Sequence, residues 1–298
     1  MTVRVANNRW NFAIEFVTLE GMDARLHDSA TDFGSVARWV YRRDPVLFTS
    51  ELTALRASRW SDPSVLLSVV DCDGEMGAAL QMPGGPVLVS GLPPTMAKAA
   101  AVEVSTIHSS LTAARGIPAT ATAFAAAWSD VTGSNAVETV SQTLYRLDEL
   151  APPDGVPGQA RHAEAADEEL LVDWLDRFFV DAFEATPDYE ARRCVLTEIV
   201  RDGGHIVFWS VDGVPVSMSR VHAPAAGVCR IGPVYTPPAS RGHGFGAAVT
   251  AAAVEHAHRS GARHVVLFAD VRNPGANRIY RRLGFVPVAE SLEYAFSA

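Results

Sequence analysis

The stretch VYTPPASRGHGFGAAV, residues 234–249, decides how this sequence is interpreted. Three glycines, Gly242, Gly244 and Gly246, follow an arginine and stand just before an alanine-rich segment of helical character. Glycine in a helix interior costs about 1 kcal/mol relative to alanine. A cluster of glycines at a helix start therefore indicates that something approaches the backbone closely there.

An anion is the ligand that such a loop suits best. The first backbone amides of a helix have no partner within the helix, and the helix dipole is positive at that end. Glycines let successive amides turn toward a phosphate, and Arg241 adds a charged donor. A P-loop requires a lysine, and this loop has none. A dinucleotide-binding loop requires its third glycine at a later position than Gly246. A tight turn into the helix without a ligand is the alternative reading of these residues taken alone.

The segments around the loop alternate between helical and strand periodicity. In the second half of the chain we expect helices over 167–183 and 189–200, a hairpin over 205–222, a strand over 227–235, a helix of about 15 residues after the loop, a strand over 264–270, a short helix over 273–285 and a last strand over 291–296. A proline- and glycine-rich linker over 151–159 precedes this series.

The first half repeats the same order of elements. We expect helices over 35–43 and 49–60, a hairpin over 64–81, an extended segment over 86–94, a long helix over 95–116, a helical segment over 118–133 and a strand over 143–147. The glycine cluster has no counterpart after Pro93-Pro94. The sequence therefore predicts two copies of one α/β unit, of which the second alone has the loop.

Two motifs in the second copy carry a family resemblance. RGHGFG fits the pattern Gln/Arg-x-x-Gly-x-Gly/Ala directly after a strand, and NPGANRIYRRLGF follows at 273–285. Together they resemble the GNAT superfamily of acyl-CoA-dependent N-acyltransferases, in detail over 160–298 and in element order alone over 1–150. The resemblance implies a tandem GNAT protein with a degenerate first domain that lacks a CoA loop. Each domain is expected to be a mixed, mostly antiparallel twisted sheet flanked by helices.

The resemblance also implies a site for acetyl-CoA as co-substrate, with no metal. A β-bulge at Gly232-Pro233 would splay the strand from its neighbour, pantetheine would pair with the backbone beyond it, and the pyrophosphate would lie on the loop amides. The implied cofactor-binding residues are Val234, Tyr235, Thr236, Arg241, Gly242, His243, Gly244, Phe245, Gly246, Asn273 and Asn277.

Tyr280 is the expected catalytic residue. The matching tyrosine in GNAT enzymes lies near the thioester sulfur and protonates the leaving thiolate. A phenol with a pKa of about 10 suits that task, since the thiolate has a pKa near 8.5. Packing of the short helix against the sheet is the structural alternative for this side chain.

The base that accepts the amine proton is not singled out by the sequence. Some GNAT enzymes have a glutamate where this chain has Cys229 and Arg230. His222, Asp181 and Glu184 remain candidates, each with a solvated or structural role as the alternative.

Composition narrows the class of partner. The 298 residues carry a net charge of −9, which argues against nucleic acid and against lysine-rich protein tails. The three cysteines form no CxxC pair, and neither a signal peptide nor a membrane-spanning run is recognised. We expect a cytoplasmic protein without a membrane partner.

The predicted function is N-acetylation of a small-molecule amine by direct attack on acetyl-CoA in a ternary complex. The alternatives are an acetyl-CoA-binding sensor or scaffold without turnover, and an acyltransferase that modifies a partner protein.

Overall fold

The computed structural model describes residues 2–7, 13–19, 21–56, 65–183, 186–201 and 203–297. The chain divides into two compact units, residues 1–143 with 289–298, and residues 144–288. Strands β8 (Asn135–Leu147) and β14 (Phe285–Ser297) each begin in one unit and end in the other.

This division differs from the predicted domain limits in two places. The expected linker, 151–159, falls inside the second unit, and residues 289–298 belong to the first. The second difference has a simple cause, since Leu292–Ala295 of β14 pair antiparallel with β7 (Ala113–Gly116) of the first unit.

The first unit is a mixed sheet with helices packed on it. Its strands follow in the order β1 to β7 and then the end of β14, all antiparallel except the pair β6–β7. The further elements are β1 (Thr2–Asn7), β2 (Ala13–Leu19), β3 (Met22–Leu26), α1 (Ala30–Tyr41), α2 (Thr49–Arg56), β4 (Leu66–Val70), β5 (Met76–Gln81), β6 (Val87–Leu88), α3 (Ala97–Ser105) and α4 (Pro118–Thr132).

One element of the first unit was predicted wrongly. The expected helix over 95–116 ends at Ser105, and Ala113–Gly116 form strand β7 instead. The sequence AARG has weak strand propensity and continues the alanine-rich pattern before it. Its extended form is fixed by pairing with β6 on one side and β14 on the other, which local sequence does not encode. Strands β1, β2, β3 and β9 were not predicted either, and residues 57–64 of the predicted elements lie outside the described residues.

Apart from β9, the elements of the second unit follow in the predicted order. Its strands run β13-β12-β11-β10-β9, antiparallel except for the parallel pair β12–β13. The elements are β9 (Gln159–His162), α5 (Glu168–Phe183), α6 (Tyr189–Arg201), β10 (His205–Val211), β11 (Val214–Val221), β12 (Val228–Tyr235), α7 (Phe245–Arg259), β13 (His264–Asp270) and α8 (Pro274–Arg282).

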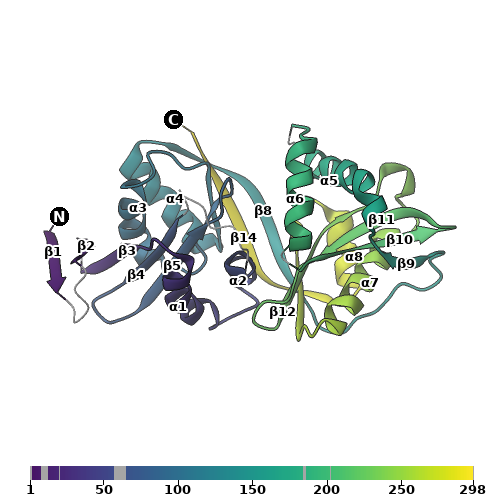
Figure 1. Ribbon diagram of the computed structural model, residues 1–298, viewed down its shortest axis with the longest axis horizontal. Helices are drawn as coiled ribbons and strands as arrows, with labels where there is room; N and C mark the ends of the chain where they lie inside the picture. The colour runs from purple at the N-terminus through teal and green to yellow at the C-terminus, as the bar shows by residue number, and fades with distance from the viewer. Residues whose placement is uncertain are drawn as a thin grey trace. The chain divides into compact units, whose positions relative to one another are not determined.

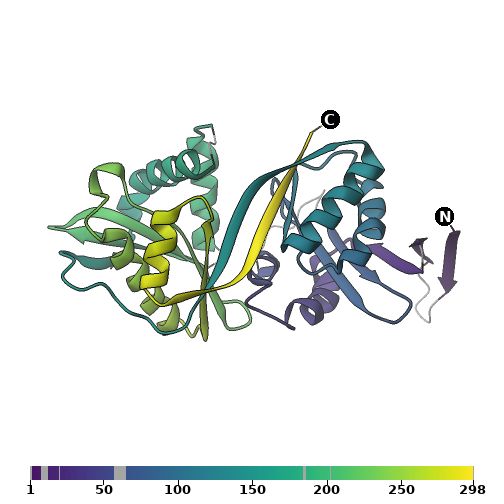
Figure 2. The same cartoon turned by 180° about the vertical axis from the view of Figure 1, so that it is seen from behind.

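Helices cover both faces of this second sheet (Figures 1 and 2). Alternate strand residues such as Phe208 and Met218 pack with Trp174 of α5 in one apolar cluster. Their neighbours in sequence, such as Val207, pack with Val254 of α7 in another. This alternation is the period of two that a strand buried on both faces requires.

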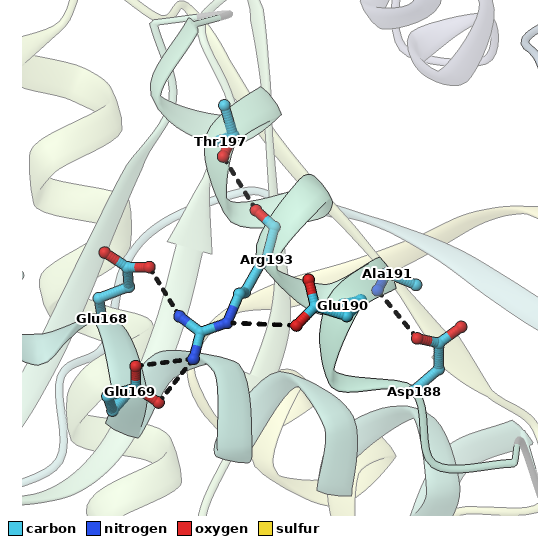
Figure 3. Close-up of polar contacts among 7 residues, drawn as sticks. All are labelled: Glu168, Glu169, Asp188, Glu190, Ala191, Arg193 and Thr197. Carbon is cyan, nitrogen blue, oxygen red and sulfur yellow. Dashed lines mark hydrogen bonds and ion pairs between the residues drawn. The ribbon is translucent and has the colours of Figure 1, made fainter.

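Charged residues tie α5 to α6, the pair of helices on the first of those faces. Figure 3 shows Arg193 of α6 between Glu168 and Glu169 at the start of α5, with N–O distances of 2.8 and 2.7 Å. The backbone amide of Ala191 donates to Asp188, which caps the start of α6. These contacts are exposed, and exposed ion pairs contribute about 0–1 kcal/mol each.

The buried contact between the two helices is the stronger one, and it yields a prediction. Asp176 of α5 is 3% exposed, accepts the Asp188 amide at 2.9 Å and pairs with Arg192 at 3.4 Å. Asp176→Ala leaves both partners uncompensated, so we expect a loss of about 3 kcal/mol in free energy of unfolding. Urea unfolding measures it, with Asp173→Ala as control. Asp173 lies on the same helix in an exposed pair, so a loss equal to that of Asp176→Ala would contradict the argument.

Candidate functional site

The predicted bulge is present in β12. Ser219 of β11 pairs with Val234 and Val221 pairs with Ile231, so the register shifts between them. Two residues of β12, Gly232 and Pro233, therefore stand opposite one residue of β11. The peptide bond between Gly232 and Pro233 is cis. An extra residue of this kind bends the strand that contains it.

Pairing of β12 with β13 stops just before the bulge. The parallel ladder joins Val228–Arg230 to His264–Val266. Residues 231–235 continue β12 beyond these three pairs, and of them Ile231, Val234 and Tyr235 still pair with β11. The β12–β13 ladder thus does not include Val234, Tyr235 or Thr236. The resemblance to GNAT enzymes implies that pantetheine lies beside these residues.

The glycine loop contains left-handed backbone directly before α7. A short 3-10 turn, Pro238–Ser240, precedes it, and Gly242 and Gly244 have φ of +84° and +82°. Gly244 is the N-cap of α7 without a side-chain capping bond, and the first helical bond runs from Ala248 N to Gly244 O. The amides just before Ala248 accordingly have no helical acceptor and point out of the helix start. A Cβ on Gly242 would meet nothing within 4 Å, so space is open beside the loop.

The corresponding turn of the first unit lacks this geometry. Pro93 and Pro237 both precede 3-10 turns, with φ, ψ of −54°, 141° and −53°, 147°. In the first unit α3 follows at once from Met96, whose φ is −87°. In the second unit four residues, 241–244, are inserted before α7. The predicted anion loop is therefore an insertion into a turn that the two copies otherwise share.

Arg241 fixes the loop to its surroundings. Its Nε donates to the Thr236 carbonyl at 2.9 Å, and its Nη2 pairs with Asp181 of α5 at 2.8 Å. A guanidinium has five N–H donors, so donors remain for a phosphate. Next to it His243 is exposed and stacks on Phe245 at 5.5 Å, while Gly246 allows the Thr236 hydroxyl close to α7.

Tyr280 lies on α8, buried in the apolar cluster that also contains residues of α7 and β13 and against which Val234 packs. Its ring contacts those of Tyr145 and Phe285, with centroids 6.4 and 6.1 Å apart. Burial raises the pKa of the Tyr280 phenol to about 12. The hydroxyl therefore keeps its proton at neutral pH and up to about pH 11.

Both asparagines of the second motif form hydrogen bonds within the protein, Asn273 at the surface and Asn277 in a buried position. Asn273 caps α8, with its side chain accepting from Ala276 N at 3.0 Å. The Asn277 amide donates to the Asp270 and Asn273 carbonyls and accepts from the Tyr145 hydroxyl at 2.8 Å. Sequence reasoning did not identify Tyr145, because its partner lies 132 positions away and no local pattern marks it.

This network predicts a structural effect for Asn277. Asn277→Ala removes one buried and two partly buried hydrogen bonds and leaves the Tyr145 hydroxyl without its acceptor. We expect a loss of about 2–3 kcal/mol in free energy of unfolding, since an orphaned buried polar group costs about 1–3 kcal/mol. Thermal and urea unfolding measure the change. Unchanged unfolding together with weaker acetyl-CoA binding would instead assign Asn277 to the ligand.

The candidate bases have different surroundings. His222 is 7% exposed, and its Nε2 lies 3.2 Å from the Gly232 carbonyl at the bulge. Burial, with Arg230 and Arg220 nearby, holds the pKa of His222 well below 6.5, so the ring is neutral. Asp181 is engaged with Arg241, and Glu184 lies outside the described residues. Burial raises the pKa of the Cys229 thiol to about 12, so this thiol is no nucleophile near neutral pH.

Two further observations concern the part of the chain that the structure describes. No group of three or more His, Cys, Asp or Glu side chains there is arranged to hold a metal ion. None of the helices there combines the length and the hydropathy needed to cross a bilayer.

Comparison with known sequences finds a family match within the second unit. Residues 168–285, which include the bulge, the glycine loop and α8, match the acetyltransferase (GNAT) family. Over 70 residues the chain is 36% identical to the mycothiol acetyltransferase of Renibacterium salmoninarum. The aligned segment covers 22% of this chain and 21% of that protein. The chain thus matches about a fifth of the length of this curated relative.

Comparison with solved structures shows the fold over nearly the whole chain. GCN5-related N-acetyltransferases from Kribbella flavida and Sphaerobacter thermophilus give TM-scores of 0.54 and 0.58 at 21% and 19% identity. The matches cover 88% and 93% of this chain and 96% of each of those chains. A tandem GNAT protein from the clavulanic acid biosynthesis pathway gives 0.55 at 15% identity, covering 93% of this chain and 98% of that one. The predicted tandem GNAT fold is therefore confirmed.

Proposed function

We propose that the second unit binds acetyl-CoA and transfers its acetyl group to an amine of a small molecule, since residues 168–285 match the acetyltransferase (GNAT) family. The observation that carries the proposal is that a β-bulge, a glycine loop and an uncapped helix start follow one another directly along the chain. A bulged strand leaves its ladder, enters a loop with two left-handed glycines and ends at the uncapped start of α7.

Each part of this arrangement has a chemical task. The amides at the start of α7 would bind the pyrophosphate, aided by the remaining donors of Arg241. The edge of β12 at Val234, Tyr235 and Thr236 would hold the pantetheine amides. Asn273 and Asn277 would act from the other side by shaping α8. The residues His243, Phe245 and the three loop glycines complete the proposed cofactor site.

Acetyl-CoA would supply an activated acyl group, and Tyr280 would protonate the leaving thiolate. A neutral amine attacks the thioester carbonyl, the C–N bond forms and the C–S bond breaks. The Tyr280 hydroxyl gives its proton to the departing thiolate. The nitrogen, positively charged after the attack, releases one proton to water, and the Tyr280 oxygen takes one proton back from solvent, so the products are the neutral amide and the CoA thiol. No covalent bond to the protein is required, since both substrates can be aligned in one ternary complex.

An alkylamine with a pKa near 10 must first lose a proton, which costs about 4 kcal/mol at pH 7. The rate should consequently rise with pH as the free amine becomes available.

The cellular compartment that we propose is suggested by the acyl donor and by the cysteine thiols. Cys72, Cys194 and Cys229 are free cysteines. Free thiols fit a reducing compartment, so we place the protein in the cytoplasm. The net charge of −9 favours a small cationic amine over nucleic acid or a basic protein tail.

Titration of acetyl-CoA in a calorimeter, followed by a screen of amines for CoA thiol release, tests the proposal. Binding with turnover supports it. Binding of acetyl-CoA without turnover of any amine favours a sensor or scaffold. That alternative is supported by the lack of a clear general base for the amine proton. Transfer of labelled acetyl to a protein in lysate, and to no small amine, would favour a protein acceptor. A protein that binds no acyl-CoA of any chain length would overturn the enzyme assignment.

A further inference from the structure

Three histidine side chains from three elements meet on one face of the second sheet. His162 belongs to β9, His205 begins β10, and His256 lies in the last turn of α7. The ring centroid of His256 lies 4.7 Å from that of His162 and 4.8 Å from that of His205. The centroids of His162 and His205 are 6.3 Å apart, and all three contacts are edge to face. His256 therefore links β9 and β10 to the helix that covers them.

The pairing of the strands explains why the rings meet. Val207 of β10 pairs with His162 and packs with residues of α7. Cross-strand partners share a face, and so do residues two positions apart, so His162 and His205 both point toward α7. His256 follows the buried Ala253 by three positions, which places it on the side of α7 that meets the sheet.

The two strands bring their other charged residues to the opposite face. Neither β9 nor β10 contains an acidic residue. Arg161 of β9 pairs with Asp167 on the α5 face, and Arg220 of the next strand stands across from Ile206 on that same face. Glu164, just after β9, caps the turn that leads into α5.

The helix adds positive charge to the cluster. Its other charged residues nearby are exposed, and they are Glu255, His258 and Arg259. Burial, together with the charges of His162, His205 and Arg259, lowers the pKa of His256 to about 4. An unfolded chain protonates histidine near pH 6.5. Because the released form takes up the proton more readily than the packed form, the packing is fully stable above about pH 6.5 and weakens as the pH falls toward 4.

The strand held by this cluster continues back to the glycine loop. β9 is the edge strand of its sheet and pairs with β10 (Figure 1). Before it, the Pro157 carbonyl accepts from Trp209 Nε1 at 2.8 Å, and Val156 lies against Gly244 of the loop. Residues 156–162, here called the strap, thus run along β10 from the glycine loop to the histidines. An exposed edge segment of this kind can open locally while the rest stays folded.

We propose that the three histidines are a pH-sensitive fastening, which holds the strap on β10 and α7 at neutral pH and releases it in mild acid. Protonation of two or three rings sets like charges side by side and opposes the edge-to-face packing that neutral imidazoles favour. Release withdraws Val156 from the glycine loop, so closure of the strap and binding of acetyl-CoA should stabilise each other. This coupling rests on the proposed function, whereas release of the strap does not.

Hydrogen exchange of the full chain between pH 7.5 and 5 tests the release. Protection factors, which correct for the intrinsic exchange rate, are compared for residues 159–163 and for β13 as the internal reference. A pKa lowered from 6.5 to about 4 shifts the opening equilibrium by about 30-fold at pH 5, and solvent screening of a partly exposed ring reduces this to about 10-fold. We expect protection of the strap to fall by that factor while protection of β13 stays unchanged.

Three variants separate the histidines from acid effects elsewhere. His256→Phe keeps a ring at the centre of the cluster and cannot take up a proton, so the acid loss should disappear. His205→Gln, at an exposed position, removes a second member of the cluster and should reduce the loss. His258→Phe is the matched control on the same helix and should behave as the wild type. Equal acid loss in His256→Phe and His258→Phe, or unchanged protection of the wild-type strap at pH 5, overturns the inference.

Acetyl-CoA added at pH 5 tests the coupling. At a concentration of about 100 times its Kd, a ligand that requires the closed strap should raise the protection of the strap by about 10–100-fold. Binding of acetyl-CoA that leaves the protection of the strap unchanged overturns the coupling. A protein that binds no acetyl-CoA at pH 7.5 overturns the proposed function, and the exchange measurements without ligand still decide whether the histidines fasten the strap.

Discussion

Gly244→Glu is expected to weaken acetyl-CoA binding by at least about 100-fold, the equivalent of about 2.7 kcal/mol. Gly244 has φ of +82° and caps α7 at the point where the loop amides converge. A glutamate there brings a negative charge to the place proposed for the pyrophosphate, and its carboxylate competes for the same amides. The new side chain also meets Val156, whose Cγ2 would lie 3.0 Å from the added Cβ. Calorimetric titration measures the affinity, and thermal unfolding measures stability.

Gly261→Glu is the control for this variant. Gly261 follows the other end of α7 with φ of +86°, and an added Cβ there meets nothing within 4 Å. Both variants therefore carry similar left-handed strain of about 1–2 kcal/mol and the same change of charge. They differ in position, since residue 244 lies at the positive, N-terminal end of the α7 dipole and residue 261 follows its C-terminal end. Equal loss of acetyl-CoA affinity in the two variants, or none in Gly244→Glu, would mean that the glycines shape a turn without binding an anion.

The same titration counts the sites. The turn of the first unit passes directly into α3 without left-handed glycines, so one acetyl-CoA per chain is expected. Two sites of similar affinity would show that the first unit binds the cofactor by other means.

Prediction from sequence succeeded where chemistry is local. Glycine itself permits the left-handed backbone of the loop, and the proline of Gly232-Pro233 interrupts the ladder because it lacks an N–H donor. The bulge at this point was expected from the resemblance to GNAT enzymes. The amphipathic period of α5 likewise fixed its limits to within one residue. The same logic failed for β7, where AARG forms a strand through its neighbours in the sheet.

Contacts between distant residues were out of reach for the same reason. The bond from Tyr145 to Asn277 and the pairing of Arg241 with Asp181 join segments that no sequence period connects. The exchange of strand ends between the units, which moves residues 289–298 to the first, depends on pairing with β7. Each of these features changes how a predicted site residue is understood, since it shows which of its polar atoms are already engaged.

Tyr280→Phe is expected to lower kcat by about 10²–10⁴-fold while acetyl-CoA affinity stays unchanged, because the phenol acts on the leaving thiolate and not on the bound cofactor. Tyr280 is buried and its ring packs against Tyr145 and Phe285, so phenylalanine preserves the packing. Tyr145→Phe is the matched control. It removes a hydroxyl 2.8 Å from Asn277, which should reduce stability by about 1 kcal/mol and leave kcat nearly unchanged.

The pH dependence separates the tyrosine from the amine. With a pKa of about 12, the Tyr280 hydroxyl stays protonated below that pH, so it does not impose an alkaline loss of activity near pH 10. The rate for an alkylamine should accordingly rise with pH up to about 10, as the free amine accumulates. Tyr280→Phe should lower this whole profile without changing its shape. A variant with normal kcat would show that Tyr280 merely packs α8, and a wild-type profile that falls between pH 8 and about 10 at full stability would contradict the raised phenol pKa.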